Sequence, residues 1–276
     1  MSTSIEIMPS SLSREEMEDL RTAIACLESA TFAQRMTDAI GKPVGAIGSM
    51  IPGSARKVVA QATETALRAA LKVALRTIDL NSAARPSRRA HKFAAAASGA
   101  FGGAFGLAAL PLELPLSTTI LLRSIAEIAR EEGEDLSVPQ GALACIEVFA
   151  LGKQSEETTF ESGYFAVRAA LAKSVTDSAR FVASHGATQS APVVARFLSQ
   201  IASRFGLVVS EKIAAQAAPV FGALGGAAVN AVFAEHFQTL ARGHFIVRRL
   251  ERTHGTGLVA FEYQRLRGET AARRAA

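Results

Sequence analysis

The 276-residue chain contains no tryptophan and has only two tyrosines and two cysteines. Cys26 and Cys145 lie far apart in apolar, helix-like patterns, so we expect reduced core residues and no disulfide or metal site. Tyr164 and Tyr263 are distant from the ends of the longest uncharged stretches. The aromatic residues that usually mark the two edges of a transmembrane segment are therefore missing. These absences exclude a disulfide framework and weaken the case for a typical membrane span.

Signatures of enzymes and of cofactor binding are also lacking. There is no HExxH pair, no cysteine-rich metal motif and no GxSxG elbow. The sequence at 152–155, Gly-Lys-Gln-Ser, lacks the upstream glycine and the Lys-Ser/Thr step of a phosphate-binding loop. Arginines occur without stacking aromatics or a known reading module, so no nucleic acid partner is expected. The sequence predicts no cofactor and no metal, and its first residues do not resemble a signal peptide, which favours the cytoplasm.

Two long stretches carry no charge. Residues 93–112 form an uncharged run of twenty residues between Lys92 and Glu113, and residues 213–234 form a run of twenty-two between Lys212 and Glu235. About 20 residues of helix span about 30 Å, the thickness of a bilayer core. Glycines at four-residue spacing let two helices approach closely. The glycines expected to form such contacts are Gly99, Gly102, Gly103, Gly106, Gly222, Gly225 and Gly226.

Both stretches are marginal as membrane spans, because glycine and proline offset their few strongly apolar residues. Three interpretations stay open: a packed helix pair inside a soluble bundle, a hairpin that enters one leaflet, and a full span. All three predict a Gly/Ala-rich helix pair at the centre of the molecule.

Apolar residues recur at helical spacing throughout, and no segment has a strand-like alternation over six residues. The sequence predicts an all-α, multi-helix bundle around the central Gly/Ala-rich pair. One predicted helix ends at Leu110, because Pro111 and Pro115 cannot both continue it. The other predicted helices cover 13–40, 54–78, 116–132, 138–151, 155–184, 192–205, 207–231, 232–253 and 258–267. We expect a helical extension at 1–38, a main domain at 39–255 and a basic tail at 256–276.

The net charge of +5 is concentrated near the C-terminus, where residues 242–276 hold eight arginines and three glutamates. A basic, amphipathic helix is predicted at 231–254, and its cations would favour an anionic surface. The candidate membrane-surface residues are Arg242, Arg248, Arg249 and Arg252. The same arginines would also complement the dipole at the end of a helix, which requires no membrane.

Glu113 is the most informative single residue, because it lies in the apolar sequence Leu-Pro-Leu-Glu-Leu-Pro at 110–115. A carboxylate in such a frame either caps or pairs with a polar group, or it belongs to a functional polar pocket. An alternative enzyme hypothesis is a hydrolase in which Glu113 or Glu235 acts with His236 or His244. A carboxylate and a histidine within hydrogen-bond distance in a pocket would support it.

Several blocks together resemble the EcsC family of bacterial proteins. They are the glycine-rich segment 97–106, the proline-flanked segment 110–115, and residues 122–129, 161–168 and 218–230. The resemblance covers about 39–255, although the family usually has aspartate at the position of Glu113.

The resemblance implies a helical protein with apolar, glycine-rich segments, and it implies no established reaction. The family takes its name from an operon with an ABC transporter. We therefore expect a non-enzymatic protein at the cytoplasmic face of the inner membrane, peripheral or partly inserted, with anionic lipid as its partner and an ABC transporter as a candidate partner. A soluble carrier of an apolar or lipid ligand is the other alternative.

Overall fold

The computed structural model describes residues 11–28, 30–40, 53–77, 110–152, 163–186, 191–217 and 222–275. These residues form helices, without a strand among them, which confirms the predicted all-α class. The helices are α1 (Arg14–Leu27), α2 (Phe32–Ile40), α4 (Gly53–Thr77), α6 (Leu110–Glu131), α7 (Pro139–Glu147), the 3-10 helix η2 (Val148–Gly152), α8 (Tyr164–His185), α9 (Pro192–Ala217), α10 (Gly222–His254) and α11 (Thr256–Ala275).

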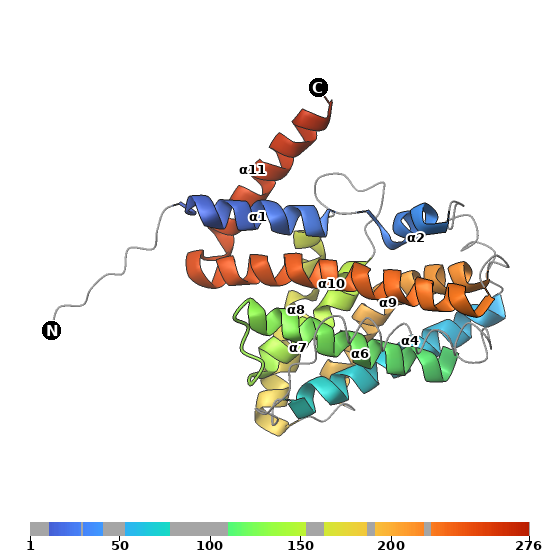
Figure 1. Ribbon diagram of the computed structural model, residues 1–276. Helices are drawn as coiled ribbons and strands as arrows, with labels where there is room; N and C mark the ends of the chain where they lie inside the picture. The colour runs from blue at the N-terminus through green and yellow to red at the C-terminus, as the bar shows by residue number, and fades with distance from the viewer. Residues whose placement is uncertain are drawn as a thin grey trace.

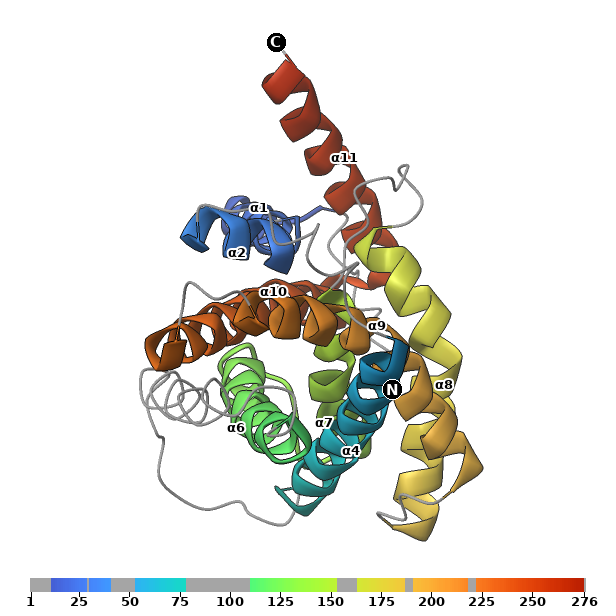
Figure 2. The same ribbon diagram turned by 90° about the vertical axis from the view of Figure 1, so that its right-hand side faces the viewer.

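Helix α10 is the axis of the bundle. It contacts α1 and α2 on one side and α6, α9 and η2 on the other, and α11 leaves its C-terminal end. Both views place α1 and α2 across α10 from α4, α6 and α7 (Figures 1 and 2). The starts of α4, α6 and α10 lie at one end of the molecule, whereas the last turns of α10 lie at the other (Figure 1).

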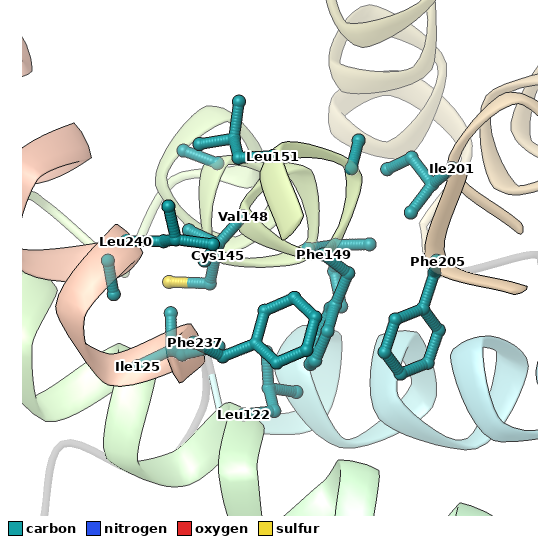
Figure 3. Close-up of a cluster of buried hydrophobic side chains, with 14 of the residues drawn as sticks. Leu122, Ile125, Cys145, Val148, Phe149, Leu151, Ile201, Phe205, Phe237 and Leu240 are labelled. Carbon is teal, nitrogen blue, oxygen red and sulfur yellow. The ribbon is translucent and has the colours of Figure 1, made fainter. Parts of the chain in front are cut away.

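Aromatic and aliphatic side chains from α6, η2, α9 and α10 fill the core (Figure 3). The rings of Phe149, Phe205 and Phe237 contact one another, with centroids 4.9 to 5.5 Å apart. Cys145 is buried beside them, as predicted for a core residue, whereas Cys26 is only half-buried. Gly152 is required here, because a Cβ atom at this position would lie 2.8 Å from the ring of Phe237.

The prediction that a helix starts only at residue 116, after both prolines, is wrong, whereas the helix predicted to end at Leu110 lies almost entirely outside the described residues. Helix α6 begins at Leu110 and includes both Pro111 and Pro115. Pro111 lies in the first turn, where an N–H group has no helical partner, so this proline removes no bond. Pro115 removes one bond to a carbonyl in that turn. The hydroxyl of Thr119 donates to the Pro115 carbonyl over 2.7 Å, which satisfies another carbonyl of the same segment.

Other boundaries also differ from the predictions. The predicted helix 13–40 is two helices, because Thr31 and Gln34 form a second capping box that starts α2. The breaks predicted at 206 and at 231 are wrong, since α9 runs through Gly206 and α10 is continuous. The predicted helix 258–267 extends over Thr256–Ala275. Gly133, with a φ of 73°, follows the end of α6 as predicted.

Candidate functional site

The two ends of α10 differ sharply in charge. Its first thirteen residues, 222–234, include no charged side chain. All its charged side chains follow, namely Glu235, Arg242, Arg248, Arg249, Glu251 and Arg252. We call the start of α6, the end of α9 and residues 222–234 of α10 the apolar end of the bundle.

A buried ion pair holds the apolar end together. The ammonium Nζ of Lys212 on α9 lies 2.7 Å from Oε1 of Glu113 on α6, and their side chains are 0% and 6% exposed. The amide of Asn230 on α10 donates to the same carboxylate oxygen over 3.1 Å. Lys212 also lies 4.8 Å from the ring centre of Phe233. Burial lowers the pKa of Lys212, and the charge of Glu113 opposes that shift. Glu113 is therefore a paired residue, one of the alternatives that the sequence left open.

The ion pair has a notable place in the sequence. Glu113 closes the uncharged stretch 93–112, and Lys212 opens the uncharged stretch 213–234. Their contact brings one end of each stretch to the same buried point, although 99 residues separate the two side chains. Sequence reasoning selected both stretches and Glu113, but it did not identify Lys212 or Asn230 as the partners.

Apolar side chains are exposed on the outer face of this end. Leu112 is 83% exposed and Leu116 is 55% exposed, and the two lie one turn apart on α6. Pro111 beside them is also exposed. Exposed basic residues, Arg56 and Lys57, lie near the start of α4 at the same end of the molecule (Figure 1). Exposed apolar residues and basic residues at the same end of a molecule are an arrangement that suits a membrane surface.

Three of the four predicted membrane-surface arginines have partners within the protein. Arg248 and Arg252 both contact Glu134 in the connection after α6. Arg249 contacts Asp19 on α1 and Glu132, at 2.9 and 3.0 Å. Arg242 is exposed. Arg248 follows Asn230 by 18 residues, so it lies about 27 Å farther along the α10 axis.

The histidines of the hydrolase hypothesis have other partners. His236 Nε2 lies 3.0 Å from the Gly152 carbonyl, and burial lowers the pKa of His236 to about 4. His244 Nδ1 lies 3.0 Å from the Tyr164 hydroxyl, and burial holds the pKa of His244 well below its usual value. The remaining nitrogen of each ring has no hydrogen-bond partner in the part of the chain that the structure describes. Glu113 is bound to Lys212, and Glu235 is exposed. The structure thus brings neither carboxylate to either histidine.

Sequence reasoning missed a second polar cluster, which joins α7, α8 and α10. Arg168 donates two bonds of 2.8 Å to Glu251, and its guanidinium lies 5.3 Å from the ring centre of Tyr164. Glu147 is buried near Arg168, and burial raises the pKa of its carboxyl group. The sequence pattern that could have revealed this cluster is the spacing of His244, Arg248 and Glu251, which lie on one face of α10.

A cavity of about 400 Å³ lies between the start of α8 and α11. Its lining residues are Gly163, Tyr164, Phe165, Ala166, Tyr263, Gln264 and Arg267. The Tyr164 hydroxyl is bonded to His244, and the Tyr263 hydroxyl donates to Glu28 over 3.3 Å. Both hydroxyls are therefore engaged by other parts of the chain, His244 on α10 and Glu28 just after α1.

The glycine prediction is only partly covered by the described residues. Gly222, Gly225 and Gly226 lie in the first turns of α10, and Gly226 is buried. Gly99, Gly102, Gly103 and Gly106 lie outside the described residues, so the close glycine-mediated helix pair stays a prediction. Across the described ranges, no group of three His, Cys, Asp or Glu side chains could hold a metal ion.

One helix in the described part, residues Pro192–Gln216 of α9, is long and apolar enough to cross a membrane by length and composition. The same helix packs against α4, α8 and η2, as a core helix does. Its composition is therefore weak evidence for a membrane location.

A comparison with known protein families matches the EcsC protein family over residues 15–250. The chain belongs to the EcsC family. The EcsC match runs from the first turn of α1 to the last turns of α10, so it includes the Glu113–Lys212 pair and the charged end of α10. The resemblance predicted from the sequence is confirmed. No curated protein and no solved structure matches this EcsC chain.

Proposed function

We propose that this EcsC protein is a non-enzymatic protein that binds the cytoplasmic face of a bacterial inner membrane through its apolar end. The observation that carries the proposal is the exposure of Leu112 and Leu116, 83% and 55%, on consecutive turns of one helix. Large apolar side chains exposed side by side on a rigid helix favour burial against another apolar phase. The neighbouring uncharged sequence 93–112 makes lipid the natural phase.

The expected affinity is modest. Full burial of a leucine contributes about 1.5 to 3 kcal/mol, so two partly exposed leucines contribute about 3 kcal/mol. A basic residue near an anionic surface adds about 1 kcal/mol, which gives Arg56 and Lys57 together about 2 kcal/mol. A total near 5 kcal/mol corresponds to a dissociation constant somewhat below about 1 mM. These groups by themselves thus support peripheral, reversible binding that depends on anionic lipid.

The arginines of the charged end play a different part in this proposal. Arg248, Arg249 and Arg252 join α10 to α1 and to the connection after α6 through ion pairs. Their charges are balanced within the bundle, so we assign membrane contact to the apolar end. An ABC transporter in the same membrane would be a suitable protein partner, and cross-linking in intact cells followed by mass spectrometry would test it.

Vesicle flotation tests the proposal. The wild-type chain is expected to float with vesicles of phosphatidylcholine and phosphatidylglycerol and to float poorly with phosphatidylcholine alone. The double variant Leu112→Ser, Leu116→Ser is expected to lose this binding. The matched control is Phe261→Ser, because Phe261 is 65% exposed on α11, away from the apolar end. Equal flotation of wild type and the double variant would refute the proposal.

A further inference from the structure

Glu147 is a buried acid without an ion-pair partner of its own. The residue ends α7 and is 4% exposed, and within the described ranges its carboxyl group forms no hydrogen bond or ion pair. The two arginines closest to it already have carboxylate partners, since Arg168 binds Glu251 and Arg248 binds Glu134. A buried polar group that lacks a partner in such a cluster requires an explanation.

The groups that face Glu147 come from several elements. Helix α4 and η2 also pack against α7, and the buried residues described on them include no charged side chain. Burial raises the pKa of Glu147, and the charge of Arg168 gives the largest opposing effect. The neutral carboxyl group is thus favoured to a higher pH than in an exposed glutamate. The charged or titratable groups that face it are Tyr164 and Arg168 on α8, Arg248 and Glu251 on α10, and Glu134 after α6.

One arginine connects this cluster to the cavity between α8 and α11. Arg168 donates two bonds of 2.8 Å to Glu251 and also lies 5.3 and 5.9 Å from the ring centres of Tyr164 and Phe165. These two rings pack on Tyr263 of α11, with centroids 6.0 and 5.1 Å away. The three rings line the cavity, and we call them its aromatic wall. Figure 2 shows the start of α8 beside α11. A displacement of the arginine would therefore reach this wall.

Ionisation of Glu147 changes the balance around that arginine. It adds a third carboxylate to the cluster, next to Glu251 and Glu134, while the number of arginines stays the same. A buried charge is costly unless it is paired. The new carboxylate therefore competes with Glu251 for Arg168.

We propose that Glu147 is a proton-operated switch, which in its neutral form leaves Arg168 on Glu251 and in its ionised form draws Arg168 away and loosens the aromatic wall. A rise in pH then opens the cavity between α8 and α11. The switch goes beyond the proposed function and does not depend on it, because it lies at the charged end of α10 and can be measured without lipid.

Tyrosine fluorescence reports on the aromatic wall without background. The chain has no tryptophan, and its two tyrosines, Tyr164 and Tyr263, both line the cavity. Burial raises the pKa of both phenols, so neither is expected to ionise below about pH 9. Acrylamide quenching of the wild type is expected to increase about twofold or more from about pH 5 to about pH 9, since the two tyrosines are 5% and 1% exposed in the closed form.

The Glu147→Gln variant removes the switch. The amide has the size of the neutral carboxyl group and cannot ionise, so quenching is expected to stay low over the whole range. All five histidines are retained, so a transition caused by a histidine would survive this substitution. A wild type without a transition, or a variant that follows the wild-type curve, would overturn the inference.

The matched control removes a carboxylate elsewhere on α8. Asp177 forms an exposed pair with Lys173, and Asp177→Asn is expected to follow the wild-type curve. Circular dichroism of the same samples separates local loosening from unfolding, and the helical signal is expected to stay constant. A loss of helix in parallel with the increase in quenching would also overturn the inference.

Discussion

The buried Glu113–Lys212 pair at the apolar end allows us to predict how much removal of one partner lowers the free energy of unfolding. The Lys212 side chain is fully buried, and its ammonium has one carboxylate partner at 2.7 Å, Glu113. Replacing Lys212 with methionine leaves Glu113 buried and, among the described residues, with the bond from Asn230 as its remaining side-chain partner. Loss of one partner of a buried ion pair costs about 3 to 5 kcal/mol. That loss is a large share of a domain stability of about 5 to 15 kcal/mol.

The double variant Glu113→Leu, Lys212→Met is expected to recover most of this loss. Apolar replacement of both partners is often neutral or stabilising by about 1 to 4 kcal/mol. The assay is urea unfolding followed by far-ultraviolet circular dichroism, because the chain has no tryptophan. Lys212→Met, Glu113→Leu and the double variant form a double-mutant cycle. If the two single losses simply add in the double variant, the side chains do not form the pair, and the reasoning is wrong.

Four further predictions concern other parts of the molecule. Folding lowers the pKa of His236 from 6.5 to about 4, so the free energy of unfolding of the wild type is expected to fall by about 3 kcal/mol between pH 6.5 and pH 4. The His236→Gln variant is expected to lose less over the same range, as measured by urea midpoints. The raised pKa of Glu147 has the opposite effect on stability, because the wild type loses stability as pH rises above the pKa that this carboxyl group has in the unfolded chain. Glu147→Gln is therefore expected to stabilise the protein at pH 7 and to have little effect at pH 4. Gly243→Ala is expected to cost about 1 to 3 kcal/mol in a thermal melt, because its Cβ would lie 2.7 Å from Leu27 Cγ and 2.9 Å from the Ala23 carbonyl oxygen on α1. Arg56→Gln with Lys57→Gln is expected to weaken flotation with anionic vesicles by about 2 kcal/mol and to leave binding to neutral vesicles unchanged.

Helical periodicity predicted the fold class and most helices, because each amphipathic segment carries its own apolar stripe. The ends of the individual helices were harder to predict from the sequence. Gly206 was read as a break, yet it lies inside α9, where a Cβ atom would come no closer than 3.8 Å to Thr63. A glycine costs an interior helix position only about 1 kcal/mol, and packing of a long helix outweighs that cost.

The partners of charged residues were the least predictable part of the site. Glu113 was identified from its apolar neighbours, but Lys212 lies 99 residues away, and local spacing does not report such a contact. The arginines of α10 are a second case in which local spacing did not identify the partners. Their spacing predicts a basic end, and only the tertiary structure shows that Asp19, Glu132 and Glu134 approach it. The local sequence thus predicted the positions of the important charged residues better than it predicted their contacts.

Quenching of a single introduced tryptophan by brominated phospholipid tests membrane contact at the apolar end most directly. The chain has no tryptophan of its own, so Leu116→Trp reports on α6 without background, and Phe261→Trp reports on α11. With vesicles that contain phosphatidylglycerol, the tryptophan at 116 is expected to shift its emission to shorter wavelength and to be quenched, while the tryptophan at 261 changes little. Equal quenching at both positions, or none at 116, would contradict the proposed orientation at the membrane.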